Sequence, residues 1–282
     1  MRIRVDHRTT YSYDRATRSI IQVLRLTPRS HDGQQVLNWK IETDVDARLR
    51  AGDDAVGNVA HLLQTEAPTA ALSIRVSGEV ETADTGGMVR GTHERLDPLV
   101  FRRDTDLTRP DPAVRELAEG VRADHPEVLE RMHALMGRIH SRVAFDTDAT
   151  HAGTSAAQAL ELGRGVCQDH AHLFIAAARC TGTPARYVSG HLARSDGVDD
   201  QAAAHAWAEA WIEHLGWVGF DPANVVCPTE AYVRVAVGLD YLGAAPIRGS
   251  ARGGGRERME VRLKVHSPRT QSQGQGQSQV QE

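Results

Sequence analysis

Apolar and polar side chains alternate with a period of two along the first 83 residues. The alternation runs through the stretches "IRVDHRTTYSY", "IIQVLRLTP", "VLNWKIETDV" and "LSIRVSGEV". Because successive side chains of a strand point to opposite faces of a sheet, each stretch predicts a strand. The segment "GDDAVGN" at 52–58 has the glycine and aspartate residues typical of a hairpin loop. Residues 1–83 are therefore predicted to form an all-β domain of the sandwich type.

The pattern changes after a glycine-rich connection, assigned to residues 84–98. In "DPAVRELAEGV", Asp111 is expected to cap a helix that has Pro112 at its first position, and "PEVLERMHALMGRIHSRV" repeats apolar residues at helical spacing. A third helix and further strand-like alternation follow Gly163. Residues 99–266 are thus predicted to form an α+β domain that ends in a strand, "RMEVRLKVH". The polar tail at 267–282 is expected to be disordered.

Composition and charge narrow the classes of partner. The chain has 282 residues, 40% of them hydrophobic, which is enough for two domains of ordinary size. The formal net charge of -4 gives no basic face, so nucleic acid is not an expected partner. The N-terminus lacks the apolar centre of a signal peptide, and no stretch approaches the roughly 18 apolar residues of a membrane span. We expect a cytoplasmic protein that does not insert in membranes.

The chain has three cysteines, Cys167, Cys180 and Cys227. This odd, sparse set does not resemble a disulfide framework. If Cys167 and Cys180 share one helix, they lie about 19 Å apart at 1.5 Å per residue, well beyond the reach of a disulfide. Cys180 is interpreted as structural, and Cys227 receives no assignment.

The stretch "GVCQDHAH" at 165–172 places Cys167 at the start of the third predicted helix. Apolar residues follow it on one helical face, at Ala171, Phe174, Ile175 and Ala178. At a helix start, unpaired N–H groups and the positive end of the helix dipole favour a thiolate, and they can also stabilise an oxyanion. Gly163 and Gly165 leave room for a substrate backbone. The alternative is that Cys167 is a small buried residue without a chemical role.

A second candidate stretch, "AHAWAEAWI" at 204–212, alternates as a strand. One face carries small apolar residues that pack on a core, and the other carries His205, Trp207, Glu209 and Trp211. The turn "EHLG" and the strand "WVGFDP" follow, which predicts a hairpin. The position of the turn decides whether His205 faces Asp221 or Asn224. Either residue provides a partner for the imidazole.

Metal sites are a weaker interpretation of the same residues. Successive residues of a helix are rotated by 100°, so the rings of His170 and His172 point about 200° apart and do not close on one ion with Cys167. The segment "ARSDGVDDQ" holds Asp196, Asp199 and Asp200 but lacks the glutamate of a calcium-binding loop. We therefore expect no metal and no cofactor.

Together the motifs resemble the transglutaminase-like superfamily of papain-type thiol enzymes, in particular bacterial members with a family-specific N-terminal β domain. The resemblance rests on "GRGVCQDHAHLFIAAARCTGTPARYVSGHL", "AAHAWAEAWIEHLGWVGFDPAN", "IRVDHRTTYSYDRATRSIIQVLRLTPR" and "VAVGLDYLGAAPIRGSARGGG". It covers nearly the whole chain except the tail. It implies an α+β fold in which an N-terminal β domain precedes a papain-like core of helices packed on an antiparallel sheet.

The resemblance implies a triad in which Cys167 is the nucleophile, His205 the general base and then acid, and Asp221 the group that orients the imidazole. The expected reaction is acyl transfer at a protein or peptide amide, and the residues leave open whether water or an amine resolves the thioester. Gly165, Trp207 and Trp217 are expected to line the substrate cleft. The chain has His170 where family members often have an aromatic residue, which bears on the polarity of the pocket.

Two other functions remain open at this point. The fold is also compatible with a non-catalytic module that binds peptides or proteins, although the intact triad argues against it. The N-terminal β domain is a candidate for recruiting a partner protein that the core then modifies.

Overall fold

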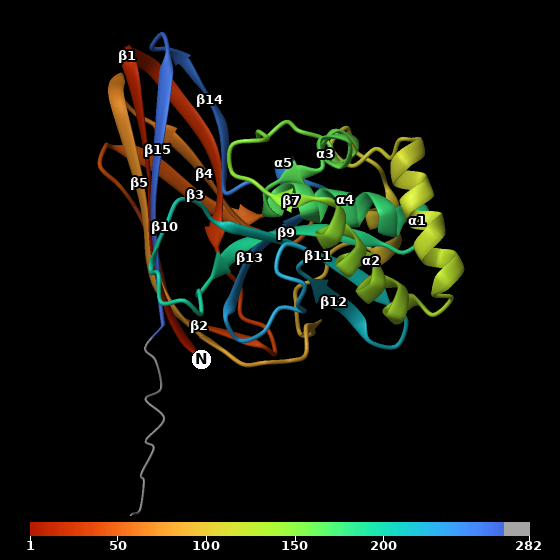
Figure 1. Cartoon of the computed structure of the whole chain (residues 1–282). Helices are drawn as coiled ribbons and strands as arrows, with labels where there is room; N and C mark the ends of the chain where they lie inside the picture. Colours follow the sequence, from red (N-terminus) through yellow and green to blue (C-terminus); the bar gives the residue numbers. More distant parts are fainter. Residues whose placement is uncertain (268–282) are drawn as a thin grey trace, which may run out of the picture.

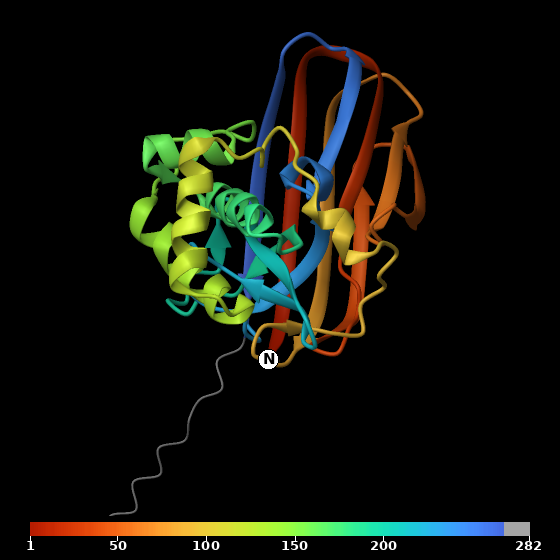
Figure 2. The ribbon, with the colours of Figure 1, turned by 90° about the vertical axis from the view of Figure 1, so that its right-hand side faces the viewer.

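The computed structural model describes residues 1–267, and the prediction of a disordered tail falls, apart from Ser267, outside the described residues. The fold is α+β as predicted, with a strand-rich body beside a core of helices on a sheet (Figure 1). Turned by a quarter, the molecule shows the helices gathered on one side and the long strands on the other (Figure 2).

The strand-rich body is built around one long strand, β1 (Arg2–Thr27). Its buried side chains occupy odd positions up to Thr17 and even positions from Ile20 onward, so the strand changes its inward face between these two residues, where its pairing with β14 shifts register. Apolar residues from both halves of β1 meet those of its neighbours in an internal core, consistent with the predicted sandwich. The neighbouring strands of this part are β2 (Gln34–Thr43), β3 (Ala47–Asp53), β4 (Val59–Thr65) and β5 (Thr69–Thr82).

Two strands from the end of the chain join this same sheet. They are β14 (Ile247–Gly253) and β15 (Glu257–His266), and both pair with β1 in antiparallel register, for example Val5 with Val265 (Figure 1). The strand at 258–266 thus forms as predicted, but it belongs to the N-terminal sheet and not to the core. Alternation along a segment predicts a strand and carries no information about its partner, which is why the sequence placed it with the preceding residues.

The core sheet has the order β13, β9, β11, β12, β6. The strands are β6 (Met88–Val89), β9 (Ala185–Leu192), β11 (His205–Ile212), β12 (Gly216–Phe220) and β13 (Tyr232–Gly238). Strand β6 lies inside the predicted connection at 84–98, where it pairs with β12. A short strand at Asp200–Gln201, β10, pairs with β15 and so links the core to the N-terminal sheet.

Helices cover one face of the core sheet (Figure 2). They are α1 (Pro112–Asp124), α2 (Val128–Arg142), α3 (Ala156–Leu162), α4 (Cys167–Cys180) and α5 (Tyr241–Ala244), whereas the short helix η1 (Pro98–Arg102) lies apart from them with Phe101 against Trp217. Asp111 caps α1 as predicted, since its side chain accepts a hydrogen bond from the N–H of Val114 at 2.8 Å. The small residues Ala206, Ala208 and Ala210 of β11 share one apolar core with α4, which lets the helix lie close on the sheet.

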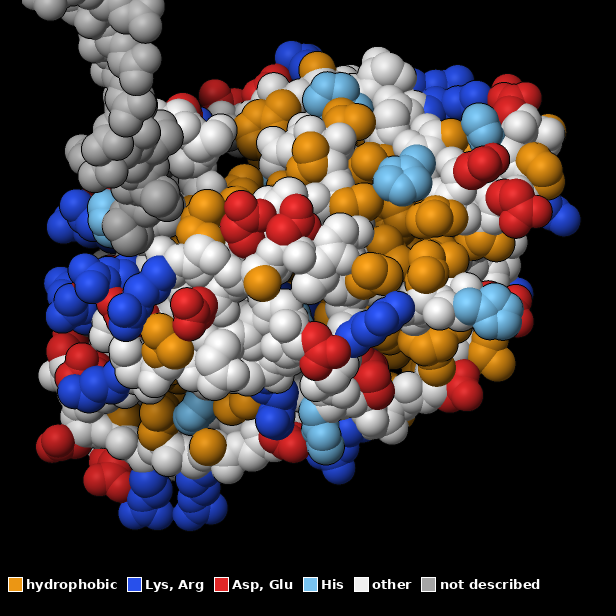
Figure 3. Space-filling model, turned by 90° about the horizontal axis from the view of Figure 1, so that it is seen from below, with side chains coloured by type: hydrophobic (Ala, Val, Ile, Leu, Met, Phe, Trp, Pro, Cys, Tyr) orange, Lys and Arg blue, Asp and Glu red, His pale blue; other side chains and the backbone are white. Residues whose placement is uncertain are grey.

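No helix within residues 1–267 is long and apolar enough to cross a membrane. On the underside of the molecule, many of the basic side chains lie on the half formed by the N-terminal sheet, while apolar side chains gather on the half formed by the core (Figure 3).

Candidate active site

The site begins at the first turn of α4. Val166 is the residue before the helix, and its N–H donates to Asp169 Oδ2 at 2.8 Å. The same oxygen accepts a hydrogen bond of 2.6 Å from the hydroxyl of Thr150, on a loop that crosses the helix start. Cys167 is partly exposed, whereas the helix is buried from Asp169 to Arg179. The sequence therefore holds one accessible thiol at the amino end of a rigid, otherwise buried helix.

The two glycines before Cys167 do not have the role predicted for them. A Cβ atom on Gly165 would lie 2.7 Å from Asp169 Oδ2, so the space beside this residue is already occupied by the capping carboxylate. Gly163 ends α3 with a φ of 63°, a left-handed conformation that glycine adopts without strain. The expectation that Gly165 lines the cleft is corrected accordingly, because the sequence pattern does not show where a neighbouring side chain will turn.

His205 is the first residue of β11, and the hairpin brings both of its predicted partners to it. Its Nε2 lies 2.6 Å from Asp221 Oδ2 and 3.4 Å from the amide nitrogen of Asn224. Trp211 pairs with Trp217, which centres the turn on His214. His205 thus contacts both Asp221 and Asn224, which the sequence had offered as alternatives. Both are close because the chain turns back directly after Asp221, and Asn224 Nδ2 also donates to Asp221 Oδ2 at 2.7 Å.

Asp221 is fully buried and saturated with hydrogen bonds. Besides His205 and Asn224, the hydroxyl of Tyr232 donates to Oδ2 at 2.8 Å, and the N–H of Ala223 donates to Oδ1 at 3.0 Å. Burial alone would raise the pKa of the Asp221 carboxyl, but the bonds from His205, Asn224 and Tyr232 lower it. Asp221 is thus held as a carboxylate facing the imidazole. Tyr232 was not predicted, and its place at the head of a strand is no signal for this contact.

Cys167 and Asp221 act on His205 together. Burial would lower the pKa of the imidazole, but hydrogen bonds and charge interactions with Asp221 and Cys167 raise it to about 10. With Nε2 bonded to Asp221, Nδ1 is the ring nitrogen left for the thiol. The arrangement favours an imidazolium that lies between the Asp221 carboxylate and the Cys167 sulfur.

The structure separates the two tryptophans that were expected to line the cleft. Trp207 is 2% exposed and lies nearly parallel to His205, with ring centroids 6.2 Å apart, so it supports the imidazole from behind. Trp217 pairs with Trp211 at the closed end of the hairpin, where the guanidinium of Arg186 lies 3.8 Å from its ring. Trp217 therefore lies outside the site, because the register of the hairpin places it six residues along β11 from His205.

The two histidines of the stretch "GVCQDHAH" at 165–172 have hydrogen-bond partners elsewhere than Cys167. Both ring nitrogens of His170 contact carbonyl oxygens, those of Val166 and Val143, at 2.9 and 2.8 Å. His172 is buried and accepts a hydrogen bond of 3.0 Å from the N–H of Tyr241. Among residues 1–267, no three His, Cys, Asp or Glu side chains are grouped so that they could hold a metal ion.

The remaining cysteines and acidic residues have structural surroundings. Burial raises the pKa of the thiols of Cys180 and Cys227. The three aspartates of the segment 193–201 form ion pairs with neighbouring side chains, namely Asp196 with Arg194, Asp199 with His266 and Asp200 with Lys264.

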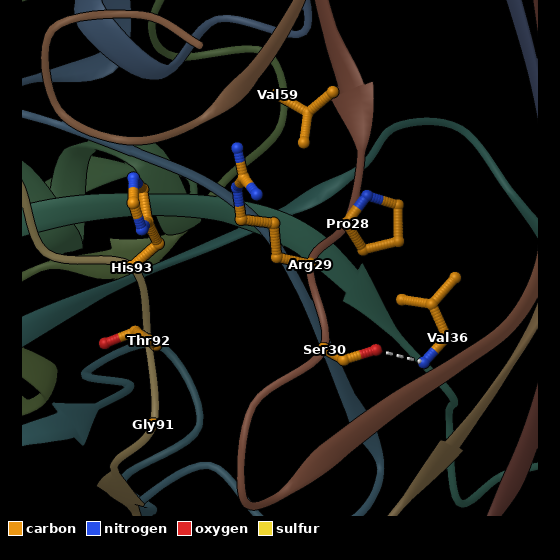
Figure 4. Close-up of a pocket in the computed structure, with 8 residues that line it drawn as sticks. All are labelled: Pro28, Arg29, Ser30, Val36, Val59, Gly91, Thr92 and His93. Atoms are coloured by element: carbon orange, nitrogen blue, oxygen red, sulfur yellow. Dashed lines mark hydrogen bonds between the residues drawn. The ribbon is translucent and has the colours of Figure 1, made fainter.

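Two cavities lie near the junction of the two bodies. The larger, of about 530 Å³, is an open depression lined by residues such as Arg29, Ser30 and His93 (Figure 4). Arg29 is already paired there with Asp53 and with the carbonyl of Gly57. The smaller, of about 40 Å³, lies behind Trp207 and Tyr232. Neither contains Cys167, His205 or Asp221.

Comparison with known proteins agrees with this geometry. Residues 115–222 match the model described as the transglutaminase-like superfamily, and residues 3–81 match the bacterial transglutaminase-like N-terminal region. The chain is 34% identical to an uncharacterized protein of Mycobacterium leprae over 94% of this chain and 98% of that protein. It is 28% identical to a protein-glutamine gamma-glutamyltransferase of Pseudomonas aeruginosa over 54% of this chain and 25% of that protein.

A solved structure shares the fold over almost the whole chain. It is that of a candidate cysteine protease from Cytophaga hutchinsonii, with a TM-score of 0.77 and 22% identity, covering 96% of this chain and 91% of that one. The matches to both bodies of the molecule, together with the identity to the Mycobacterium leprae protein, lead to one assignment. The chain belongs to the transglutaminase-like superfamily and carries the bacterial transglutaminase-like N-terminal domain.

Proposed function

We propose that the protein is a cysteine-nucleophile acyl-transfer enzyme that acts on a protein or peptide amide through a thioester. The main support for the proposal is the hydrogen bond of 2.6 Å between the His205 imidazole and the buried Asp221 carboxylate. The Cys167 thiol also raises the pKa of this imidazole. A triad with this charge distribution suits nucleophilic attack by sulfur at neutral pH.

The residues divide the reaction into two stages. In the first, the Cys167 thiolate attacks the amide carbonyl carbon, and the N–H groups of the first turn of α4 stabilise the oxyanion. The C–N bond then breaks, the imidazolium of His205 gives its proton to the departing nitrogen, and a thioester remains. In the second, neutral His205 takes a proton from water or from an amine as it attacks the thioester, and the thiolate leaves. Water gives a protease or amidase, and an amine gives a transglutaminase.

Alkylation by iodoacetamide tests the activated thiol without knowledge of the substrate. At pH 7 we expect Cys167 to react faster than Cys180 and Cys227, because only Cys167 is accessible beside an imidazolium. The sites are distinguished by mass spectrometry of digested peptides. Equal rates at the three cysteines would contradict the proposal.

Turnover is measured on a glutamine-rich protein in the presence of a fluorescent primary amine. Release of ammonia with amine incorporation indicates transfer, and peptide cleavage or ammonia release without incorporation indicates hydrolysis. Cys167→Ala is expected to abolish either activity, whereas the matched variant Cys180→Ala retains it. A Cys167→Ala variant with undiminished turnover would refute the proposal and favour a binding module.

A further inference from the structure

One residue outside the hairpin contacts the catalytic carboxylate. Asp221 Oδ2 accepts hydrogen bonds from His205 and Asn224, which lie on the hairpin and its following turn, and from the hydroxyl of Tyr232, the first residue of β13. The ring of Tyr232 also packs against His205 and Trp207, with centroids 5.8 and 5.4 Å away. Tyr232 therefore fixes the carboxylate through its hydroxyl and supports the imidazole through its ring.

The hydroxyl of Tyr232 is a permanent donor. Burial and the neighbouring charge of Asp221 raise the pKa of Tyr232 far above its ordinary value. The hydroxyl therefore stays protonated at neutral pH, where it donates to the Asp221 carboxylate.

The strand that carries Tyr232 is an edge strand of the core sheet. Strand β13 pairs with β9 on one side, and the register shifts between Arg234 and Ala236. The second edge of such a strand has backbone N–H and C=O groups that need partners when they are buried.

Two amide side chains of the N-terminal domain supply those partners. Gln34 accepts from the N–H of Arg234 at 2.8 Å and donates to its carbonyl at 2.9 Å. Asn58 accepts from the N–H of Val237 at 2.8 Å and donates to its carbonyl at 2.8 Å. Each amide thus makes the same pair of bonds that a neighbouring strand would make.

Both amides are themselves fixed on the side of the N-terminal domain. Gln34 is 3% exposed and also donates to the carbonyl of Arg29 at 2.8 Å, and Asn58 is 5% exposed and donates to Asp54 at 2.9 Å. Neither side chain is free to move away from β13 without breaking bonds on both sides. The N-terminal domain therefore holds the outer edge of β13, while its pairing with β9 holds the inner one.

We propose that Tyr232 is a positioning residue for Asp221, and that Gln34 and Asn58 of the N-terminal domain hold the strand that carries it. The proposal rests on the proposed function, since it concerns the same triad. It assigns the N-terminal domain a part in building the active site.

Tyr232→Phe tests the first half, because phenylalanine keeps the ring contacts and removes only the hydroxyl. Loss of one hydrogen bond to a charged group is expected to lower kcat about tenfold with little change in KM. Without this donor the Asp221 carboxylate is a stronger acceptor for the imidazole, so His205 is expected to titrate at higher pH by NMR, and the alkaline limb of the rate profile moves with it. Tyr13→Phe is the matched control, because the Tyr13 hydroxyl is buried without a hydrogen-bond partner in the described part of the chain.

Gln34→Met and Asn58→Leu test whether the N-terminal domain holds β13. Each substitution leaves a side chain of similar volume and removes both hydrogen bonds to β13. We expect both variants to shift the His205 titration in the same direction as Tyr232→Phe. Combined with Tyr232→Phe, either change should add little further shift, because the residues act through one contact. Circular dichroism establishes that each variant is folded before it is compared.

The outcomes distinguish the positioning role of Tyr232 from the proposed acyl-transfer function. If Cys167→Ala abolishes turnover but Tyr232→Phe matches Tyr13→Phe in kcat and in the His205 titration, the positioning role is wrong and the catalytic one stands. If Gln34→Met and Asn58→Leu leave the His205 titration unchanged while Tyr232→Phe shifts it, the role of the N-terminal domain is refuted. If Cys167→Ala retains turnover, both proposals fail.

Discussion

Two buried histidines make the junction between the bodies sensitive to acid. His7 of β1 and His191 of β9 are 4% and 3% exposed, and their rings meet edge to face with centroids 5.9 Å apart. The Nδ1 atom of each lacks a hydrogen-bond partner among the described residues. Burial lowers the pKa of His7 from 6.5 to about 4, against a small opposing effect of Asp6, and burial with the neighbouring His7 lowers the pKa of His191 to about 3.

These values set the sign and size of a stability change. At pH 5 both rings are neutral in the folded protein, whereas both are mostly protonated in the unfolded chain. The unfolded chain binds more protons, so the free energy of unfolding falls as the pH falls below about 6.5. Between pH 7 and pH 5 each ring contributes a loss of about 2 kcal/mol, since one unit of pKa corresponds to about 1.4 kcal/mol. The two together remove about 4 kcal/mol from a total of roughly 5–15 kcal/mol.

The variant His191→Gln removes one of these titrating groups. Urea unfolding followed by circular dichroism at pH 7 and pH 5 gives the loss of stability for each protein. We expect the loss to be smaller in His191→Gln than in the wild type by about 2 kcal/mol. His214→Asn, at a side chain that is 89% exposed, is the control and should keep the wild-type loss. An identical loss in His191→Gln and the wild type would refute the reasoning.

Two further predictions concern the packing around the site. Gly165→Ala brings a Cβ within 2.7 Å of Asp169 Oδ2, so the cap of α4 should weaken and the urea midpoint should fall by the equivalent of about 1 kcal/mol. Gly137→Ala, where a Cβ meets no atom within 4 Å, should instead raise the midpoint, and equal responses would contradict this account. Arg186→Met leaves the buried Glu209 without one of its two cationic partners and should lower the free energy of unfolding by about 3–5 kcal/mol. A loss below 1 kcal/mol would show that the pair is not coupled.

Local periodicity predicted most of the elements and the class of the fold. The cap at Asp111, the cysteine helix and the hairpin that starts at His205 all follow from patterns within about 20 residues of sequence. The hairpin limited the partner of His205 to two residues, Asp221 and Asn224, and both contact the ring.

Contacts between distant segments were not predictable in the same way. Tyr232 reaches Asp221 from another strand, and nothing in "YVRVAV" distinguishes a tyrosine that donates to a buried carboxylate from one that packs in a core. From its place in the sequence, Trp217 was predicted to line the cleft. In the structure its ring packs instead against the guanidinium of Arg186, a residue 31 positions earlier in the chain. Side-chain partners of this kind depend on how the sheets are assembled, which a single sequence does not contain.

The return of β14 and β15 to β1 has a consequence for synthesis of the protein. Strand β1 leaves the ribosome long before β14 and β15, yet one whole edge of it, from Arg4 to Tyr13 and from Thr17 to Leu24, pairs only with these late strands. Until residue 266 has emerged, the nascent chain carries an open edge along its longest strand. The domain that holds β13 against the triad is then still incomplete. We expect the thiol of Cys167 to acquire its full reactivity only after these strands are released.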